Sequence, residues 1–552
     1  MRQLGRLVRT VRHLKPEQIL GRVRFKLFKP TLNMSAEPKL RSQLANLRSP
    51  IEKASSMLDP DTFEFLGEVG SIPDPSSWDD ARKPKLWLYN LHYFDYLSAQ
   101  DANSKGVWHT QLLTRWVEEN PPTEGNAWEP YPVSLRICNW VKWSITGNPL
   151  PDQCENSLAV QARWLRKRLE WHLLGNHLFA NAKALVFAGL FFDGAEADSW
   201  LRDGLSIISR ELPEQVLADG GNFELSPMYH AIFLEDMLDL INIASCYQLG
   251  LQEHVSTWRE VATRMLGWLS TMLHPDGQIS LFNDAAIGIA PSYQDLVAYA
   301  ERLEIAPPSE PNGAFIALKD SGYLRLSNQA AVAILDVARI GPDYIPGHAH
   351  ADTLSFELSV AGQRVVVNGG TSRYGDGPER NLERSTAWHS TVEVAGENSS
   401  EVWGGFRVGR RAYPCGLKTS EKSGLLEVSC SHDGYRYLRG RPTHTRTWRL
   451  ENDYLTVVDS VSQPSLPAVA RFILHPEITI NGNAEDGLLL TLPNGTSLSL
   501  ICQTGKCKVI DAQYAPQFGK RFPTKAIAVC LESGTAKVQF RWNIKARKKN
   551  AN

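Results

Sequence analysis

Apolar residues recur at helical spacing from about residue 86 to about residue 305. Segments such as LFANAKALVFAGLFF, MYHAIFLEDMLDLINIASCYQL and WREVATRMLGWLSTML place apolar side chains three and four positions apart, as on one face of a helix. Short breaks with Gly, Pro and Asp separate these segments, so successive helices should pack antiparallel as hairpins. This pattern therefore predicts that residues 86–305 form an α/α toroid or bundle of helical hairpins.

The pattern changes after a Pro-rich link at residues 306–313. Short alternating runs rich in Val, Leu, Thr and aromatic residues follow, such as TLSFELSV, QRVVVNGG and RTWRLENDYLTVVDSV, with turn residues between them. Alternation of this kind is typical of an antiparallel β-sandwich, which we expect over residues 314–545. The predicted class is α+β multidomain, and the charged tail at 545–550 is expected to fray.

Residues 1–85 form a third region, expected to be a basic helical extension and linker. Its first part interleaves Arg and Lys with Leu, Val and Phe, which fits an amphipathic helix that binds anionic lipid or polysaccharide. A helix docked on the main body with a solvated basic face is the commoner outcome for such a charge run. The segment lacks the apolar region and cleavage site of a secretory signal, which predicts a cytoplasmic location, with the periplasm as the alternative.

Composition narrows the binding partners. The formal net charge of -1 gives no overall field for nucleic acid, and no stretch approaches the roughly 18 apolar residues of a membrane span. Sixteen Trp and sixteen Tyr include rings that could stack on sugars, although core packing explains most of them. The eight cysteines are scattered singly, which predicts free buried thiols. The oligomeric state is left open.

Two histidines, His348 and His350, precede the strand TLSFELSV. If the extended conformation begins there, both imidazoles project on one face and could act as metal ligands or acids. Asn368 and His389 are the candidate further ligands. A His-x-His pair alone is weak evidence for metal, because hydrogen-bonded structural histidines are common.

A helix-start signal surrounds Tyr229. Ser226 is a predicted N-cap and Pro227 takes the first helical position, so Tyr229 lies in the first turn. The positive end of the helix dipole should lower the pKa of Tyr229 and make it a usable base. Packing in the toroid with a hydrogen-bonded hydroxyl is the alternative.

Polar residues also crowd the apolar segment GNHLFANAKAL. Asn176, His177 and Asn181 either cross-link helices or face a cleft, and the sequence leaves both interpretations open. An arginine-rich group suits an acidic glycan, because guanidinium forks pair with carboxylate or sulfate, and surface salt bridges are the alternative. Its members, with neighbouring tryptophans, are Arg373, Arg380, Arg384, Arg407, Arg410, Arg411, Trp388 and Trp403.

Several segments together resemble the heparinase II/III-like family of polysaccharide lyases and related proteins from bacterial polysaccharide gene clusters. They are LWLYNLHYFDYL (from Leu86), WEPYPVSLRICNWVKW (from Trp128), GNHLFANAKAL (from Gly175), GGNFELSPMYH (from Gly220), FNDAA (from Phe282), GHAHADTLSFEL (from Gly347) and VVVNGGTSRYG (from Val365). The resemblance implies an α/α toroid followed by a β-sandwich. It also implies β-elimination on an acidic, uronate-containing polysaccharide.

The resemblance also implies roles for individual residues. Asn176 would neutralise the substrate carboxylate with His177 beside it, Tyr229 would be the base and acid, and His348 a second acid/base or orienting group. We therefore predict that Asn176, Tyr229 and His348 converge at one groove between the two domains. The substrate-binding residues would be Trp128, Arg136, Arg373, Arg384, Trp388 and Arg407.

His350 and His389 match metal-ligand positions of family members that bind zinc, but Asn368 stands where those relatives commonly place Asp. An amide oxygen is a poorer zinc ligand than a carboxylate. We expect no required cofactor, with zinc or calcium as the ions that the His350 and His389 pair would accept.

Two other functions remain open from sequence. One is a non-catalytic glycan-binding or assembly protein on the same fold. The other is a glycoside hydrolase with Glu224 and Asp284 as paired acids, which requires carboxylates roughly 5 to 9.5 Å apart across a cleft.

Overall fold

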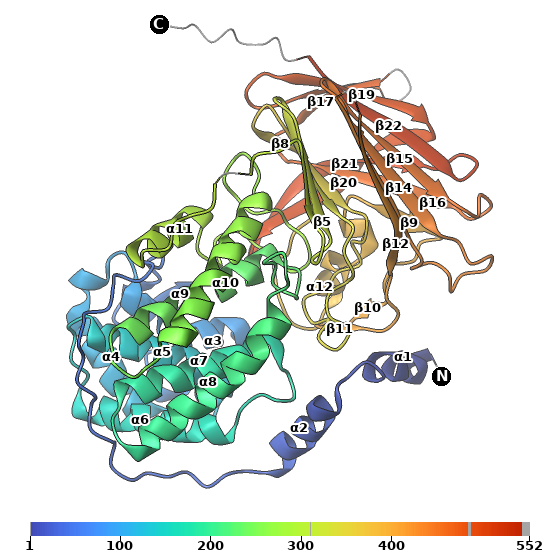
Figure 1. Ribbon diagram of the computed structural model, residues 1–552. Coiled ribbons are helices and arrows are strands. Elements are labelled where there is room, and N and C mark those ends of the chain that lie inside the picture. Colours follow the sequence, from blue (N-terminus) through green and yellow to red (C-terminus); the bar gives the residue numbers. More distant parts are fainter. Residues whose placement is uncertain (1, 310, 423, 484–486, 544–552) are drawn as a thin grey trace, which may run out of the picture.

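A helical domain and a β-sandwich follow each other along the chain, as predicted (Figure 1). The computed structural model describes residues 2–309, 311–422, 424–483 and 487–543, so the predicted charged tail lies outside the described residues. Within these ranges, none of the helices combines the length and apolar character needed to cross a bilayer. All eight cysteines are free thiols, as predicted, but only Cys138, Cys154, Cys246 and Cys430 are also buried as expected.

The helical domain is an array of packed hairpins. Its helices are α3 (Lys85–Tyr93), α4 (Gly106–Glu119), α5 (Pro130–Ile145), α6 (Asp152–Lys167), α7 (Gly175–Phe191), α8 (Ala195–Gln215), α9 (Pro227–Ser245), α10 (Gln252–Thr271) and α11 (Tyr293–Arg302). Helix α7 is apolar on nearly every face and buried along most of its length, because α5, α8 and α9 surround it. Gly189 lets α7 and α8 pack closely, since a Cβ there would lie 2.5 Å from the backbone nitrogen of Leu201 on α8.

The sandwich consists of two large antiparallel sheets around one apolar core. One sheet has the order β12 (Pro414–Lys422), β13 (Leu425–His432), β14 (His444–Leu450), β15 (Tyr454–Val461), β22 (Thr535–Trp542), β19 (Ser497–Thr504), β18 (Gly487–Thr491), β17 (Thr479–Asn483). The other has the order β20 (Lys506–Gln517), β21 (Lys520–Cys530), β16 (Ala468–Leu474), β8 (Gln363–Val367), β7 (Phe356–Val360), β6 (Ala331–Asp336), β5 (Tyr323–Ser327), β4 (Phe315–Leu318), with β9 (Val392–Val394) on β16. Alternate residues of β13 and β14 are buried, because successive side chains point to opposite faces.

Besides five short 3-10 helices, several smaller elements of the described chain lie outside these two parts. They are α1 (Arg2–Val11), α2 (Pro16–Leu27), a small sheet of β1 (Met57–Asp59), β2 (Thr62–Phe65) and β3 (Glu68–Ser71), a ribbon of β10 (Val402–Trp403) and β11 (Arg407–Val408), and α12 (Pro378–Glu383). The small sheet is absent from the sequence-based expectation for residues 1–85. Helices α1 and α2 lie along the edge of the molecule, and the chain then runs around the helical domain (Figure 1).

Buried polar contacts join the two domains. His274, just after α10, bonds Glu357 at 2.9 Å and Ser359 at 2.8 Å on β7. Arg364 on β8 pairs with Asp276 at 2.7 Å, and His274 and Glu357 are fully buried. These contacts hold the sandwich in a fixed position against the toroid, and the groove described next lies at the same junction.

Candidate active site

Tyr229 of the toroid and His348 of the sandwich stack against each other. Ser226 caps α9 by accepting the Tyr229 backbone N–H at 3.2 Å, and Pro227 begins the helix, which confirms the predicted helix start. The ring centroids of Tyr229 and His348 lie 3.7 Å apart with planes at 30°. The Tyr229 hydroxyl also shares a 3.0 Å hydrogen bond with the hydroxyl of Tyr374. A phenol and an imidazole from different domains thus meet at one point.

The pKa of Tyr229 differs from the prediction. Burial raises it well above its ordinary value, and the neighbouring Tyr374 and Asp284 raise it further. The expectation of a lowered pKa was wrong, because loss of hydration outweighs the partial positive charge at the helix start. Tyr229 is therefore a phenol in the resting protein.

Asn176 enters the groove from the first turn of α7. The two residues before it, Leu174 and Gly175, have positive φ of 62° and 55°. A Cβ on Gly175 would lie 3.0 Å from a carboxylate oxygen of Glu224, so glycine lets the chain pass close to that acid. The backbone N–H of Asn176 donates to Glu224 at 3.3 Å. Its side-chain amide makes no hydrogen bond with any residue that the structure describes, which leaves it available to a ligand.

His177 is fixed beside Asn176 by a buried acid. Its Nδ1 lies 3.2 Å from Glu170, and its ring packs 4.5 Å from the ring of Tyr131. Burial alone would lower the pKa of His177, but the Glu170 carboxylate raises it above its ordinary value. Asn181 accepts the Glu170 backbone N–H and donates to its carboxylate, at 2.9 and 3.1 Å. Of the two interpretations left open, Asn181 therefore cross-links and Asn176 faces the cleft.

Asn176 and Tyr229, two of the three residues predicted to converge, line one small groove formed by residues of the helical domain. His348, the third, does not line it but stacks on Tyr229, and its Nε2 lies 3.4 Å from Glu224 Oε2. That oxygen is buried and makes no hydrogen bond with any residue that the structure describes. The lining residues are Tyr131, Asn176, Asn222, Glu224, Tyr229, Ile232, Phe233 and Asp236.

Asp284 lies behind the groove and holds both histidines of the GHAHAD segment. Its two oxygens lie 3.0 Å from His348 Nδ1 and 2.8 Å from His350 Nε2. Arg380 donates to both oxygens, and Asp284, His350 and Arg380 are almost fully buried. Burial would raise the pKa of Asp284, but Arg380 and the histidine hydrogen bonds hold it well below its ordinary range. Asp284 is thus a permanent anion that orients His348.

The residues predicted to hold a metal assemble only in part. His350 Nδ1 and His389 Nε2 face each other at 3.1 Å, a spacing that two ligands of one ion can adopt. Asn368 is engaged elsewhere: its amide donates to Ser355 at 3.3 Å and accepts from the Ser390 backbone at 3.0 Å. Among the residues that the structure describes, no three His, Cys, Asp or Glu side chains form a metal-binding group. The donor set therefore does not fit zinc or calcium, both of which need further ligands.

Four predicted substrate-binding residues are instead buried, which corrects those assignments. Arg136 is fully buried, donates to Gln161 at 2.9 Å and to two backbone carbonyls, and packs on Trp116. Trp128 is 3% exposed and donates to a backbone carbonyl within the core. Arg384 donates to the carbonyls of Ala349 and Gly404, and Trp388 to that of Gly370. Side chains buried in this way and hydrogen-bonded inside the fold cannot contact a glycan.

The other two predicted substrate-binding residues are at the surface. Arg373 forms an exposed ion pair with Glu379, and the Arg407 guanidinium lies 4.9 Å from the ring of Trp403. Sequence reasoning assigned no role to Tyr131 or Tyr374, although both lie in segments that carry the resemblance. Their presence in those segments was the signal in the sequence that could have identified them as site residues.

Comparison with known proteins places the chain in a family. The "Heparinase II/III N-terminus" family model matches residues 85–307, and the "Heparinase II/III-like, C-terminal" model matches residues 310–543. The two matches cover the toroid and the sandwich in the order observed here. The chain belongs to the heparinase II/III-like family.

Individual relatives are more distant. A heparin-sulfate lyase of Bacteroides stercoris is 24% identical over 350 residues, covering 59% of this chain and 50% of that protein. One from Pedobacter heparinus is 27% identical over 347 residues, covering 58% and 49%. The chain thus spans about half the length of these curated relatives. A solved structure of heparinase III has the same fold, with a TM-score of 0.66, 16% identity, and coverage of 96% of this chain and 85% of that one.

Proposed function

We propose that the protein is a polysaccharide lyase that cleaves an acidic, uronate-containing glycan by β-elimination. The observation that carries the proposal is the 3.7 Å stack of Tyr229 and His348 beside the unpartnered amide of Asn176. These are a proton-transfer pair and a carboxylate-binding group on one groove. The curated relatives, named heparin-sulfate lyases, support the same reaction class.

The first requirement of the reaction is to weaken the charge of the substrate carboxylate beside C5. Removal of the C5 proton sends electron density onto that carboxylate, which resists further negative charge unless donors face it. The Asn176 amide supplies uncharged donors. His177 stands next to it with a pKa raised by Glu170, so it contributes positive charge over a wider pH range. We propose that this pair makes a metal ion unnecessary.

The second requirement is proton transfer. The C5–H bond breaks, a C4–C5 double bond forms, and the C4–O4 bond breaks with its electrons leaving on O4, which takes up a proton. We assign the proton transfers at C5 and O4 to Tyr229, because His348, held by Asp284, stacks on its ring beside Asn176. Because Tyr229 rests as a phenol, it can deliver a proton to O4 directly. As base it must first lose that proton.

The two alternative functions fit the groove less well. A hydrolase would need Asp284 at the sugar, but that carboxylate is fully buried and paired with Arg380. A non-catalytic binding protein would be expected to have the three key side chains dispersed or blocked. Here Asn176 and Tyr229 line the same opening, and His348 stacks on Tyr229.

The lining also bears on the substrate. Glu224 and Asp236 contribute carboxylates to the groove, Asp236 being paired with Lys183 at 2.6 Å, and no Lys or Arg is among the lining residues. Carboxylates accept hydrogen bonds from sugar hydroxyls and repel anionic groups, so the groove disfavours negative charge beyond the one uronate carboxylate that Asn176 and His177 would bind. We therefore propose a uronate glycan with few or no sulfate groups at the cleavage position.

Incubation with a panel of uronate glycans tests the proposal. The panel should pair sulfated and unsulfated chains of one backbone, and the readout is the far-ultraviolet absorbance of the unsaturated product. We expect the product from the unsulfated member, with or without a chelator, and its formation at least about 1,000 times slower with the Tyr229→Phe variant. Reducing ends released without that absorbance would instead indicate hydrolysis, and activity lost with the chelator would contradict the metal-free scheme.

A further inference from the structure

The first two helices turn apolar faces away from the protein. On α1 the exposed apolar residues are Leu4, Leu7, Val8 and Val11, and on α2 they are Ile19, Leu20, Val23 and Leu27. Each set recurs at three- and four-residue spacing, which is one side of a helix. Exposure is large, at 68% for Leu4, 70% for Leu20 and 81% for Leu27. We name these eight residues, with the 47% exposed Phe28, the apolar arm face.

The opposite sides of the same helices hold the arm on the body. Arg9 on α1 pairs with Glu401 at 2.8 Å, and Thr10 accepts a hydrogen bond from Trp403 of the sandwich. On α2, Gln18 is buried and donates to the Tyr344 carbonyl, while a Cβ on Gly21 would lie 2.9 Å from the backbone of His172. Polar residues thus face the protein and apolar residues face water, the reverse of the usual arrangement for a surface helix.

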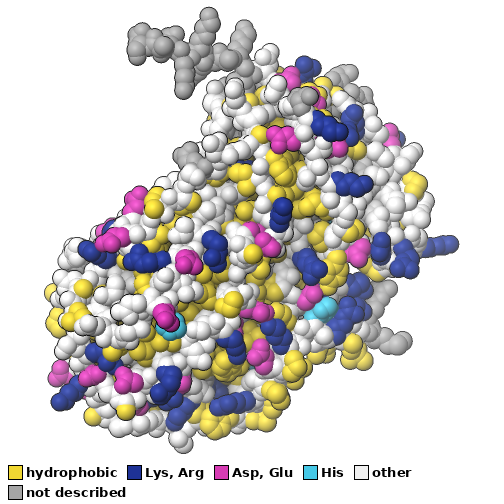
Figure 2. All heavy atoms as spheres, viewed as in Figure 1, with side chains coloured by type: hydrophobic (Ala, Val, Ile, Leu, Met, Phe, Trp, Pro, Cys, Tyr) yellow, Lys and Arg dark blue, Asp and Glu magenta, His cyan; other side chains and the backbone are white. Residues whose placement is uncertain are grey.

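Positive charge surrounds the apolar arm face. Residues 1–29 contain nine Lys or Arg and a single acidic residue, Glu17. Four exposed members form no ion pair with any described residue: Arg22, Arg24, Lys26 and Lys29. Figure 2 shows hydrophobic and basic side chains together along the edge where α1 and α2 run. A partner for this face must therefore be both apolar and anionic.

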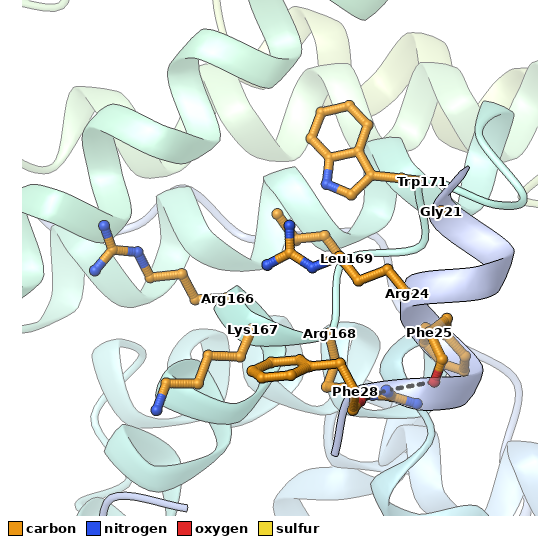
Figure 3. A pocket seen from close by; sticks show the side chains of 9 residues that line it. All are labelled: Gly21, Arg24, Phe25, Phe28, Arg166, Lys167, Arg168, Leu169 and Trp171. Carbon is orange, nitrogen blue, oxygen red and sulfur yellow. Dashed lines mark hydrogen bonds between the residues drawn. The ribbon is translucent and has the colours of Figure 1, made fainter. Parts of the chain in front are cut away.

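A basic pocket adjoins the same face at the end of α2 (Figure 3). No acidic residue is among its lining, and Phe28 belongs both to the pocket and to the apolar arm face. Arg168 donates to the backbone carbonyls of Phe25 and Phe28, and its Nε is buried without a partner among described residues. The lining residues are Gly21, Arg24, Phe25, Phe28, Arg166, Lys167, Arg168, Leu169 and Trp171. Arg166 pairs with Asp203 at 2.7 Å and Lys167 donates to the Thr31 carbonyl, whereas Arg24 forms no ion pair with any described residue. The unpaired guanidinium of Arg24 and the remaining donors of its neighbours are suited to a phosphate.

We propose that α1 and α2 attach the protein to the surface of an anionic phospholipid bilayer, with the apolar arm face among the acyl chains and the basic pocket on a lipid phosphate. Helices that lie in the plane of a membrane combine an apolar side with Lys and Arg that bind anionic head groups. The charge argument selects this partner over a second copy of the chain, because two such faces would bring like charges together.

Vesicle flotation with the full chain tests the proposal independently of any lyase activity. The vesicles are phosphatidylcholine alone or phosphatidylcholine mixed with phosphatidylglycerol. The test variant is Leu20→Glu/Leu27→Glu. Its matched control is Leu44→Glu/Val107→Glu, which changes two residues of similar exposure, 66% and 70%, elsewhere on the surface. All four side chains are exposed, so both variants should fold, as equal thermal unfolding midpoints would verify.

We expect the wild type and the control to float with the anionic vesicles and not with phosphatidylcholine alone. Added salt should weaken this binding, and the test variant should lose it by about tenfold or more. Failure of the wild type to bind anionic vesicles, or equal binding by the test variant, would overturn the proposal. So would self-association without vesicle binding that the test variant abolishes, which would assign the face to a second copy.

Discussion

The two walls of the groove differ in how completely their polar groups are satisfied. On the toroid wall, the Asn176 amide has no hydrogen-bond partner among the described residues, and the buried Glu224 Oε2 has only the 3.4 Å ion pair with His348. Behind the sandwich wall, Asp284, a residue of the helical domain between α10 and α11, is held from three sides by His348, His350 and Arg380. The toroid wall thus keeps a free donor at the opening, whereas the carboxylate that holds the sandwich wall is fully engaged.

This difference separates binding from positioning. Unsatisfied groups at an opening are free to bind substrate, whereas saturated buried ion pairs fix geometry and cannot change partners without a large loss of stability. Tyr229 lies between the walls, attached to the toroid by its helix and to the sandwich by the stack with His348. Variants on the two walls should therefore fail in different ways.

The largest effect should come from Tyr229, where the walls meet. Tyr229→Phe removes only the hydroxyl that transfers protons, so the fold should be kept. We expect kcat/KM to fall by on the order of 10³ to 10⁴, about 4 to 5.5 kcal/mol, measured by the absorbance of the unsaturated product.

The pH profile of the wild type sharpens this prediction. Because burial raises the pKa of Tyr229, phenolate is scarce at neutral pH and increases about tenfold for each pH unit below that pKa. If Tyr229 is the base, kcat/KM should rise with pH across the neutral range. A flat profile would leave it only the role of acid.

Behind the sandwich wall, Asp284→Asn should act on stability first. The substitution keeps the shape but leaves Arg380 buried without its counter-ion, which should cost about 3 to 5 kcal/mol in urea unfolding. Asp511→Asn, an exposed carboxylate on β20, is the control and should stay within about 0.5 kcal/mol. An equal result for the two variants would mean that the Asp284 cluster does not hold the wall together.

On the toroid wall, Asn176→Ala should lower activity and leave stability nearly unchanged. Loss of the carboxylate-facing amide is expected to lower kcat/KM about 100-fold, roughly 2.7 kcal/mol. The free energy of unfolding should hardly change, because the amide has no hydrogen bond to a described residue. Unchanged activity would remove Asn176 from carboxylate neutralisation.

Asn181, five positions along the same helix, provides the contrast. Its buried amide bonds Ser134 and both the backbone and the carboxylate of Glu170. Asn181→Ala should therefore cost about 1 to 3 kcal/mol of stability in urea unfolding, since it leaves polar groups unpaired. Activity should fall less than in Asn176→Ala, through loosening of His177. The opposite ranking would place the substrate carboxylate at the wrong asparagine.

Short-range sequence patterns were sufficient to predict features that depend on neighbouring residues, such as helix starts and the type of secondary structure. The Ser226–Pro227 cap predicted the start of α9, and helical or alternating periodicity predicted the toroid and the sandwich. The environment of Asp284 had no such signal. Its partners His348, His350 and Arg380 lie 64, 66 and 96 residues away, so only the folded chain shows their contacts.

The arginines show a second limit of prediction from the sequence. Their number suggested an acidic glycan, but sequence does not tell whether a guanidinium binds a ligand or a buried carbonyl. Arg136 and Arg384 do the latter, each inside a helix or loop where the backbone carbonyls of another segment approach. Burial also reversed the direction of the pKa shift of Tyr229, which a helix-start argument alone could not reveal.

The smallest effect is expected at Arg373, which belongs to neither wall. Its side chain is 57% exposed and pairs with Glu379, which is 49% exposed, and such pairs contribute about 0 to 1 kcal/mol. Arg373→Ala should leave the urea midpoint nearly unchanged and alter the KM for the uronate glycan by less than about twofold, because surface charges are screened. A tenfold rise in KM would instead extend the substrate path from the groove onto this surface. The substrate would then contact a basic surface around Arg373 in addition to the two walls of the groove.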